Sequence, residues 1–380
     1  MDFFEGRLFV EAVIIGGGAS GIACAIRLKQ NMPQAGVTVL EQLDEPCKKL
    51  YATGNGRCNI TNKSAEGYEL TSGFFKSLGL VLRESSEGRI YPYSNQAATV
   101  VNILEKACEQ YKINVVCDAG VYKAERVGEQ FNVFSRKGIF ICDTLVIATG
   151  GKAQSALGST GSGYALAESF GHKITELSPA LVQLTSSSKH CRALKGVRTK
   201  CSLAIEINGE VKADSYGELL FTDYGISGIV TMDLSKYVSD RRLKDKSEKC
   251  IAIIDFIPSM SEDELYEHIC SFGSLEGILP AKLCSILAKQ AENDARKTAK
   301  YAKNWRIIIT GTKGYDYAQI TNGGVENTEL KENNESTLCS GLYIVGELTD
   351  NQFKCGGFNL DYAFSSGIRA ADGIAENDKN

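Results

Sequence analysis

The sequence predicts an α/β protein in which one domain, built from both ends of the chain, is interrupted by an inserted module. Three observations support this fold class. A strand, a glycine turn, a helix and a second strand follow one another between residues 10 and 40. Two later apolar strands, at residues 145–148 and 342–345, each end in a glycine-rich turn. Between them, after about Leu184, short alternating strands replace the α/β pattern.

The N-terminal segment has the length and order of a βαβ unit. Residues 10–15 form an apolar strand that turns at Gly16-Gly17-Gly18, and a helical pattern continues to about Gln30. Residues 37–40 form the next strand. A unit of about thirty residues with this order is the building block of a parallel sheet.

The following residues continue the α/β pattern. Residues 99–111 are predicted to form a helix and residues 115–116 a strand. Residues 131–134 and 139–142 alternate in polarity as in a hairpin, and residues 145–148 form a buried strand.

The inserted module begins with strands and ends with helices. Asn208-Gly209, between apolar runs, is a strong hairpin-turn signal, and short strands are expected to about residue 256. Ser261 and Glu264 then form a possible capping box. The predicted helix has one apolar face, and a second helix starts near Pro280. The apolar face of the first helix comprises Leu265, Ile269 and Phe272.

The last part of the chain returns to the α/β pattern, with strands at 306–310 and 342–345 and a helix from about Tyr362 to Glu376. We therefore expect four pieces of chain in three structural parts. These are residues 1–186 with 308–380 as the discontinuous domain, 187–256 as an inserted β-rich domain, and 257–307 as a helical segment of the insert.

Composition excludes several classes of protein. A net charge of −4 gives no reason to expect a nucleic-acid partner. The thirteen cysteines are scattered and none forms a CxxC pair, so most are expected to be reduced core residues. Acidic residues near the N-terminus argue against a signal peptide, and no apolar stretch approaches 18 residues. No membrane association is expected, and the cytoplasm is the expected location.

The turn after the first strand matches a dinucleotide fingerprint. Gly16 permits a tight turn, Gly18 lets the backbone approach a pyrophosphate, and Gly21 lets helix and strand pack closely. The helix N-terminus offers free amides to the phosphates. Glu41 ends the second strand, where a carboxylate accepts the ribose hydroxyls and repels a 2′-phosphate. The site therefore suits FAD or NAD, with an unliganded glycine-rich turn as the alternative.

Three further segments bring small residues to the ends of strands or into polar loops, where ligands of open α/β sheets gather. The loop at residues 53–62 contains one arginine, which suits a phosphate or a flavin ring. The turn at 148–151 is followed by a glycine-rich run at 158–163. The C-terminal turn at 346–359 precedes a helix whose N-terminus can stabilise negative charge on a reduced flavin, while Asp350 or Glu347 is a candidate for the ribityl chain.

These motifs resemble the BaiN/YhiN-type flavoproteins, the aminoacetone oxidase family of FAD-binding enzymes, from about Val13 to Ala371. The most specific matches are residues 54–62, 158–161, 355–360 and 363–367, with further agreement at 88–92 and 217–222.

The resemblance implies a Rossmann-like FAD-binding domain of the two-dinucleotide-binding-domain flavoprotein type, with inserted β-barrel-like and small helical domains. It implies one FAD, with Glu41 at the adenosine ribose and the C-terminal turn at the isoalloxazine. The implied cofactor-binding residues are Gly16, Gly18, Ala19, Ser20, Gly21, Glu41, Gln42, Lys49, Gly54, Arg57, Cys58, Asn59, Thr61, Val121, Thr149, Gly150, Gly151, Gly346, Glu347, Asp350, Gly356, Gly357, Phe358, Asn359 and Leu360.

The chain departs from the family pattern at three polar positions. Ser162 stands where the family usually has Asp, Asp223 where it has His, and Asp361 where it has Gln. The fingerprint is intact, so these departures bear on the substrate and activity and leave the expectation of FAD unchanged.

The catalytic group is open at this stage, with Cys355 and Asn359 as candidates. Cys355 lacks the second thiol that disulfide reduction needs, and a small residue tolerated beside the ring is the alternative. The three histidines do not stand at a metal-ligand spacing, so no metal is expected.

The expected function is an FAD-dependent oxidoreductase acting on a small organic substrate. A flavin-mediated reductase is favoured, with NAD(P)H as a candidate transient reductant. An amine oxidase producing hydrogen peroxide and a flavin-binding protein with a non-metabolic role, such as RNA modification or redox sensing, are the alternatives. The substrate, the choice between NADH and NADPH and the oligomeric state are open.

Overall fold

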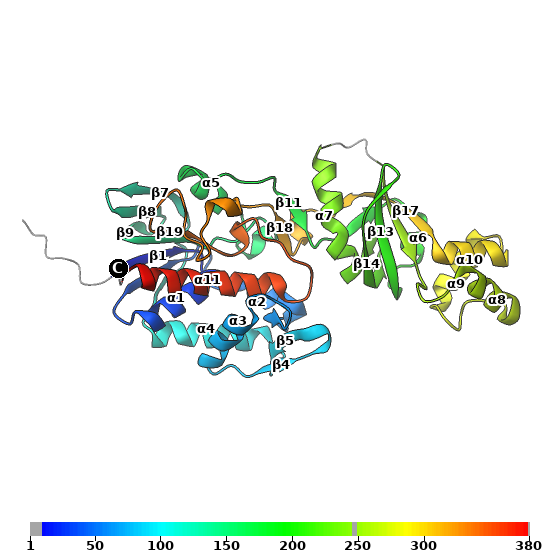
Figure 1. Ribbon diagram of the computed structural model, residues 1–380, viewed down its shortest axis with the longest axis horizontal. Coiled ribbons are helices and arrows are strands. Elements are labelled where there is room, and N and C mark those ends of the chain that lie inside the picture. Colours follow the sequence, from blue (N-terminus) through cyan, green and yellow to red (C-terminus); the bar gives the residue numbers. More distant parts are fainter. Residues whose placement is uncertain (1–9, 245–248, 379–380) are drawn as a thin grey trace, which may run out of the picture. The chain divides into compact units, whose positions relative to one another are not determined.

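The computed structural model describes residues 10–244 and 249–378, and the chain divides into two compact units. The first unit comprises Met1–Leu177 and Ile320–Asn380, and the second comprises Ser178–Gln319. The expected insert, residues 187–307, lies inside the second unit. The predicted α/β class with an inserted barrel and a small helical part is confirmed (Figure 1).

The first unit is built on a five-stranded parallel sheet in the order β19-β10-β1-β2-β6. These strands are β1 (Glu11–Ile15), β2 (Gly36–Leu40), β6 (Asn114–Val116), β10 (Thr144–Ile147) and β19 (Leu342–Ile344). All four residues of β10 are buried, as expected for a strand covered on both faces. The sheet brings the two ends of the chain together, because β19 pairs with β10 and β10 with β1.

Helices α1 (Ala19–Asn31) and α11 (Phe358–Asn377) pack closely against each other beside this sheet (Figure 1). Gly367 makes the close approach possible, since a Cβ there would lie 2.1 Å from the Ser20 carbonyl oxygen. Helix α4 (Ala97–Gln110) packs against α1 and contributes Val100, Val101 and Leu104 to the same hydrophobic core.

Smaller elements complete the first unit. They are α2 (Lys48–Ala52), α3 (Tyr68–Ser77), α5 (Ser162–Ser169), the sheet β3-β5-β4 (Thr61–Asn62, Arg89–Pro92, Leu82–Glu84), the sheet β7-β8-β9 (Val121–Val127, Gln130–Ser135, Gly138–Cys142) and β18 (Ile320–Asn322). The predicted hairpin is β8–β9, and β7 adds a third strand that the sequence analysis did not anticipate. Buried and exposed residues do not alternate regularly along β7, so the sequence pattern does not identify it as a strand.

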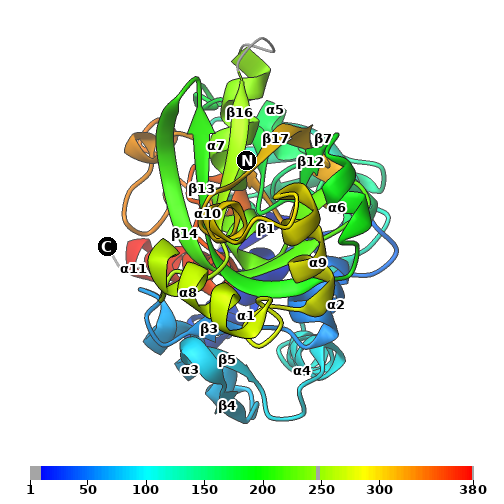
Figure 2. The same ribbon diagram turned by 90° about the vertical axis from the view of Figure 1, so that its right-hand side faces the viewer.

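The second unit contains a closed six-stranded barrel in the order β12-β15-β14-β13-β16-β17 (Figure 2). Its strands are β12 (Leu184–Ser186), β13 (Arg198–Ile207), β14 (Glu210–Phe221), β15 (Gly225–Ser227), β16 (Cys250–Asp255) and β17 (Trp305–Thr312), and β11 (Ser178–Ala180) precedes them. The predicted turn is confirmed: Asn208 and Gly209 join β13 and β14 with φ of 52° and 88°. Closure removes exposed strand edges.

The expectation of short strands up to residue 256 is wrong for one segment. Helix α7 (Ile229–Lys244) occupies it and buries Val230, Leu234 and Val238 against the barrel. The β-branched residues and buried Thr231 weaken the apolar stripe that identifies a helix in sequence. Tertiary packing therefore decided this element.

The helical part contains α8 (Glu262–Phe272), α9 (Ala281–Gln290) and α10 (Ala295–Lys303), while α6 (Lys189–Ala193) precedes β13. The predicted capping box of Ser261 and Glu264 is confirmed. Phe272 was expected on the inner face of α8, but it is 74% exposed because it is the last helical residue before the Gly273 cap. Helix α10 was not predicted.

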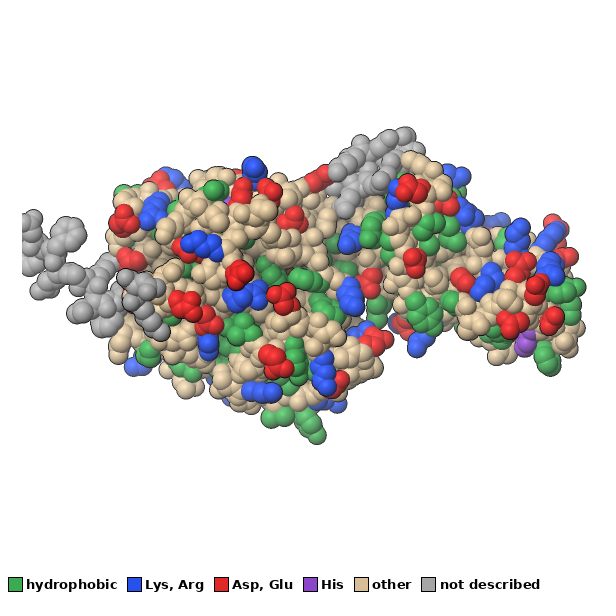
Figure 3. Space-filling model, viewed as in Figure 1, with side chains coloured by type: hydrophobic (Ala, Val, Ile, Leu, Met, Phe, Trp, Pro, Cys, Tyr) green, Lys and Arg blue, Asp and Glu red, His purple; other side chains and the backbone are tan. Residues whose placement is uncertain are grey.

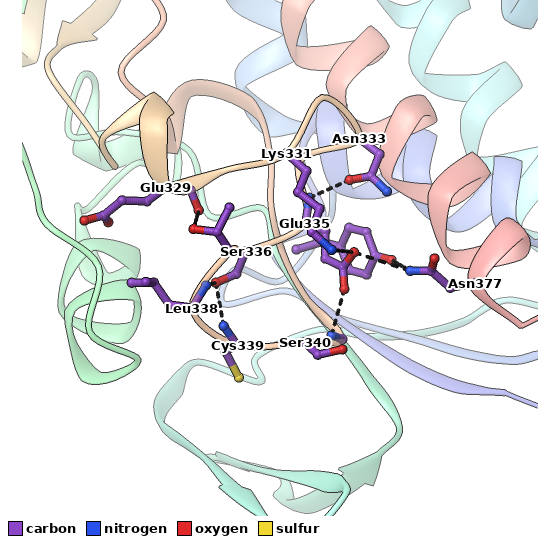
Figure 4. Close-up of polar contacts among 12 residues, drawn as sticks. Glu329, Lys331, Asn333, Glu335, Ser336, Leu338, Cys339, Ser340 and Asn377 are labelled. Atoms are coloured by element: carbon purple, nitrogen blue, oxygen red, sulfur yellow. Dashed lines mark hydrogen bonds and ion pairs between the residues drawn. The ribbon is translucent and has the colours of Figure 1, made fainter. Parts of the chain in front are cut away.

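The segment before β19 is held by the buried carboxylate of Glu335 (Figure 4). Glu335 accepts from Lys331 Nζ at 2.9 Å and from the Gly341 amide at 3.2 Å, and Asn377 of α11 donates at 3.4 Å. Burial alone would raise the pKa of Glu335, but these donors outweigh it, and the pKa lies below its usual value. This network fixes β19 and therefore the turn that follows it.

Buried His172 bonds on both ring nitrogens, to Glu329 at 3.0 Å and to Ser336 at 2.8 Å. Such an acid–base–hydroxyl line also occurs in hydrolases. Here Ser336 is only 2% exposed, and its oxygen accepts the amides of Leu338 and Cys339 (Figure 4). The arrangement ties a loop together, because no substrate could reach the hydroxyl.

The cysteines in the described part of the chain are all free thiols. None of the described helices is long and apolar enough to cross a membrane.

Candidate cofactor and substrate site

The turn between β1 and α1 is shaped by its glycines. A Cβ on Gly16 would lie 2.4 Å from the Ala148 carbonyl oxygen, and one on Gly21 would lie 2.0 Å from the Gly16 carbonyl oxygen. A Cβ on Gly18 would meet nothing within 4 Å, so this position faces open space. The first turn of α1, with Ala19 and Ser20, contains no acidic residue. It therefore offers free amides to an anion.

Glu41 lies beside this turn with both carboxylate oxygens oriented. Oε2 accepts the Gly17 amide and Oε1 accepts the Leu43 amide, each at 2.8 Å. The residue is 8% exposed. An ionised carboxylate has about four acceptor positions, so two remain for ribose hydroxyls. This geometry fits the ribose role that the sequence analysis assigned.

Lys49 joins segments that are far apart in the sequence. Its Nζ lies 2.8 Å from Glu347 Oε2, and 3.4 Å from Ser159 Oγ. Gln42 Nε2 donates to the Gly158 carbonyl. The structure therefore brings the β2 loop, the 158–163 run and the turn after β19 to one place. The ion pair of Lys49 and Glu347 is half-buried, where mutual attraction exceeds that of a surface pair.

The turns after β10 and β19 meet at this edge of the sheet. A Cβ on Gly151 would lie 2.5 Å from Glu347 Oε1, while Gly346 closely approaches Ser20. Thr149 Oγ1, beside Gly150, is buried without a hydrogen-bond partner. Asp350 accepts from Gln352 at 2.7 Å.

Val121 stands apart from the turns just described. It begins β7, two residues after Ala119, whose amide donates to the Glu41 carbonyl at 2.8 Å. Val121 is therefore connected to the site by the backbone hydrogen bond between Ala119 and Glu41.

Helix α11 begins directly after a double-glycine turn. Gly356 and Gly357 have φ of 122° and 102°, a region that favours glycine. A Cβ on Gly357 would lie 2.6 Å from the Thr61 carbonyl oxygen. The helix starts at Phe358, earlier than the expected Tyr362, because Gly357 serves as its N-cap. The amides of the first turn, up to Leu360, have no acceptor within the helix.

Asn359 holds the preceding loop. Its Oδ1 accepts the Phe353 amide at 2.9 Å, and its Nδ2 donates to the carbonyls of Phe353 and Lys354 at 2.9 and 3.3 Å. The amide group is thus engaged at both ends with backbone. These contacts support positioning of the 353–355 turn as the function of this side chain.

The loop at residues 53–62 folds against α11. Cys58 is fully buried, and burial raises the pKa of its thiol to about 12, so it is not a thiolate at neutral pH. Gly54 has φ of 57° and packs near the Asn59 amide. Asn59 Oδ1 is buried without a partner and lies beside Gly357. Thr61 Oγ1 donates to Asp361 Oδ1 at 2.6 Å.

Asp361, one of the departures from the family pattern, is 3% exposed. Besides Thr61 it accepts the Gly67 amide at 3.0 Å. Burial is the largest influence and raises the pKa of Asp361, while these hydrogen bonds act in the opposite direction. The carboxylate anchors the 61–67 segment to the start of α11.

Several residues that were not predicted as site residues also shape the site. Asn62 Nδ2 donates to the carbonyls of Glu87 and Gly356, both at 3.0 Å. Ser366 Oγ accepts the Gly346 amide at 3.0 Å, and Thr321 Oγ1 accepts the Lys152 amide at 2.7 Å. Asn62 and Ser366 lie within the segments 54–62 and 363–367 already singled out, whereas Thr321 carries no local signal.

The glycine turn of α1, the ribose-type carboxylate and the unpartnered polar atoms of Thr149 and Asn59 fit an extended dinucleotide at the carboxyl edge of the sheet. The fold and the site define a flavoprotein of the Rossmann class. The chain belongs to the HI0933-like family, because residues 67–373 match the model described as HI0933-like protein Rossmann domain. It is an FAD-dependent oxidoreductase.

Relatives of this chain extend over nearly its whole length. It is 35% identical to a 3-dehydro-bile acid delta(4,6)-reductase of Clostridium scindens, over 96% of this chain and 98% of that protein. It is 28% identical to a ribosomal RNA dihydrouridine synthase of Haemophilus influenzae, over 97% of this chain and 99% of that protein. A protein of the same name from Escherichia coli is 27% identical, over 96% and 98%.

Solved structures share the fold. The 3-ketosteroid delta1-dehydrogenase of Sterolibacterium denitrificans aligns with a TM-score of 0.54 at 12% identity, over 98% of this chain and 100% of that chain. A quinol-fumarate reductase aligns with a TM-score of 0.50 at 15% identity, over 97% of this chain and 71% of that chain.

Proposed function

We propose that this enzyme reduces a carbon–carbon double bond conjugated with a carbonyl group in a small organic substrate, with NAD(P)H reducing its FAD. The observation that carries the proposal is the full-length 35% identity to a delta(4,6)-reductase of 3-dehydro bile acids. The other relatives are named dihydrouridine synthases, and dihydrouridine forms when the carbon–carbon double bond of the uracil ring is saturated. That double bond is conjugated with a ring carbonyl. Both names therefore denote reduction of the same type of bond.

The residues of this chain would divide the work of holding FAD. The amides after Gly18 would bind the pyrophosphate, and Glu41 would accept the ribose hydroxyls. Lys49, Glu347 and Asp350 would hold the polar middle of the cofactor. When bound, FAD supplies the acceptance and donation of hydride.

The start of α11 would stabilise negative charge that develops on reduction. The free amides of Phe358, Asn359 and Leu360 are oriented by the helix, so they need no rearrangement when charge appears. The positive end of the helix dipole acts in the same direction. The double glycine lets the backbone itself approach a ligand at this place.

Anaerobic stopped-flow absorbance of the purified holoenzyme tests the proposal. NADH or NADPH is expected to bleach the oxidised flavin, and a conjugated enone, such as a 3-oxo-4,6-diene steroid, is expected to restore its absorbance. NMR of the product should show saturation of the conjugated double bond. Flavin that stays oxidised with both nucleotides would contradict the proposed electron donor, and failure of reoxidation by every enone would contradict the proposed substrate.

The same apparatus distinguishes the alternatives. An amine oxidase would be bleached by an amine and would produce hydrogen peroxide in air. A dihydrouridine synthase would be reoxidised by a uridine-containing RNA, and the full-length identity to two enzymes of that name makes this arm necessary. Reoxidation by the RNA and by no free enone would assign the substrate to nucleic acid.

A further inference from the structure

Asp361 is a buried carboxyl group in the first turn of α11, at a position where the family pattern usually has glutamine. On the face of the molecule shown in Figure 3, acidic side chains lie at the surface among basic ones. Asp361 is instead 3% exposed. Within residues 10–244 and 249–378, no lysine, arginine or histidine forms an ion pair with it. A buried carboxylate without a cationic partner binds a proton more readily than one at the surface.

The charged groups around Asp361 are paired, exposed or far along the helix. The titratable and charged residues on α11 and on the elements that pack against it here are Arg27, Lys63, Glu66, Tyr68, Glu69, Glu347, Arg369 and Asp372. Three of them have ion-pair partners elsewhere, namely Arg27, Lys63 and Glu347. Glu66 and Glu69 are exposed. Burial is the largest influence on the pKa of Asp361 and raises it, while Arg369, eight residues and about 12 Å further along the helix, acts in the opposite direction.

The hydrogen bonds of Asp361 accommodate both the ionised and the protonated carboxyl group. Oδ2 accepts the Gly67 amide at 3.0 Å, and Oδ1 accepts the Thr61 hydroxyl at 2.6 Å. A hydroxyl both donates and accepts, and Thr61 Oγ1 also lies 3.4 Å from the Asn62 carbonyl oxygen. A proton on Oδ1 is therefore donated to Thr61, whose own hydrogen turns to the Asn62 carbonyl. Protonation leaves none of these buried groups unpaired.

The same end of α11 is the place proposed above for the reduced flavin. Asp361 follows the three residues with free amides, and its own amide donates to the Gly357 carbonyl at 2.9 Å. At a rise of about 1.5 Å per residue, it lies within one helical turn of those amides. An ionised Asp361 and a negatively charged ring would both be stabilised by the same positive helix end, and they would repel each other in a buried environment.

We propose that Asp361 is a redox-linked proton acceptor, whose carboxylate takes up one proton when the FAD of this site is reduced and releases it when the FAD is reoxidised. In the reduction, the ring accepts two electrons from the reductant and one proton at N5, which leaves it with one negative charge. A second proton from solvent forms an O–H bond on Asp361 Oδ1, so the summed charge of ring and carboxyl group is unchanged. The inference rests on the proposed function in placing the reduced ring at the start of α11, and it does not depend on the substrate.

The flavin potential measured against pH tests the inference in the FAD-loaded enzyme. Dye equilibration with dithionite and without substrate gives the potentials of wild type and of Asp361→Asn from about pH 5 to about pH 8. A tenfold change in proton concentration shifts a two-electron potential by about 30 mV for each proton taken up. Within this range wild type is expected to take up two protons per two electrons, and the variant one. The potential of the variant should therefore exceed that of wild type at high pH and converge with it at low pH.

Infrared difference spectra of the reduction locate the second proton. Wild type should gain the C=O band of a protonated carboxylic acid, shifted in D₂O, and Asp361→Asn should lack it. Glu335→Gln is the matched control, because it removes another buried carboxylate of the first unit. Glu335 contacts Asn377, sixteen residues and about 24 Å further along α11, so this variant should keep the pH dependence and the band. Asp361→Gln, with the residue that the family usually has, carries the test if Asp361→Asn loses FAD.

Potentials of wild type and Asp361→Asn that differ by the same amount at every pH would overturn the inference, because a carboxylate that only anchors the 61–67 segment exchanges no proton on reduction. Absence of the carboxylic-acid band in wild type would overturn it as well. If either occurs in an enzyme that NAD(P)H reduces and an enone reoxidises, the proposed function stands and the inference fails. Potentials that diverge with pH, together with failure of every enone, would keep the inference and overturn the proposed substrate.

Discussion

The two units of the chain bury different kinds of groups. All buried carboxylates of the described residues, Glu41, Glu335 and Asp361, lie in the first unit, as does buried His172. Buried polar side chains in the described part of the second unit are serine and threonine hydroxyls. Its core is aliphatic and aromatic and is centred on the barrel.

This difference separates a scaffold from a site. Burying a charge is unfavourable unless hydrogen bonds compensate it, so each buried carboxylate marks a place where geometry is fixed by polar contacts. In the first unit these contacts hold the turns of the candidate cofactor site. In the second unit the hydrogen bonds between neighbouring strands close the barrel around an apolar core. Substitutions in the two units should therefore fail in different ways.

The largest expected effect is on the stability of the second unit. Trp305 is 2% exposed and packs edge-on against Phe256 in the barrel, and Trp305→Ala should destabilise this unit by about 3–5 kcal/mol through the cavity it leaves. Thermal unfolding followed by circular dichroism measures it, while flavin fluorescence reports release of FAD from the first unit. Ile308→Ala on the same strand is the control, because Ile308 is 55% exposed. A loss of FAD before any unfolding of the variant would contradict the separation of the two units.

The second effect concerns FAD affinity. Glu41→Gln replaces one carboxylate oxygen with an NH₂ group, which would face a backbone amide that also donates. A hydrogen bond to a charged group contributes about 1.5–3 kcal/mol. FAD should therefore bind about 10–150-fold more weakly. Fluorescence titration of the apoprotein measures the Kd. Exposed Glu109→Gln should bind FAD as the wild type does. An unchanged FAD affinity of the Glu41→Gln variant would show that Glu41 does not bind the ribose.

The third effect is a pH-dependent stability in the first unit. Because the folded pKa of Glu335 is below the ordinary glutamate value of 4.5, its stabilisation is present above that pH and is lost as pH falls through the folded pKa. Glu335→Gln should lower the free energy of unfolding by about 1–2 kcal/mol at pH 7. Urea unfolding should show the difference shrinking below about pH 4.5. Exposed Glu332→Gln is the matched control, and a gap that persists at low pH would refute the charge-based origin.

The fourth effect concerns the start of α11. Phe358→Pro removes one amide at the first helical position, where proline is otherwise tolerated. Loss of about 1–3 kcal/mol of stabilisation of the reduced state would lower a two-electron potential by about 20–65 mV. Dye equilibration measures the potential. Phe358→Ala keeps the amide and should keep the potential. An unchanged potential in folded, FAD-loaded Phe358→Pro would mean that this turn does not contact the reduced ring.

Elements whose signals are local could be predicted from the sequence. The glycine fingerprint between β1 and α1, the Asn208-Gly209 turn and the Ser261 capping box each depend on residues a few positions apart. Their physical causes are backbone conformation and hydrogen bonds within one turn, which a reader of the chain can evaluate without its fold.

Tertiary structure alone decided which of the candidate residues meet. Lys49 pairs with Glu347, 298 positions away, and Thr61 with Asp361, 300 positions away. It also decided α7, and it gave Asn359 backbone partners in the loop before it. Pairing over such distances depends on where loops run after the sheet has formed. The course of these loops cannot be predicted from short-range periodicity, because packing against another part of the chain fixes it.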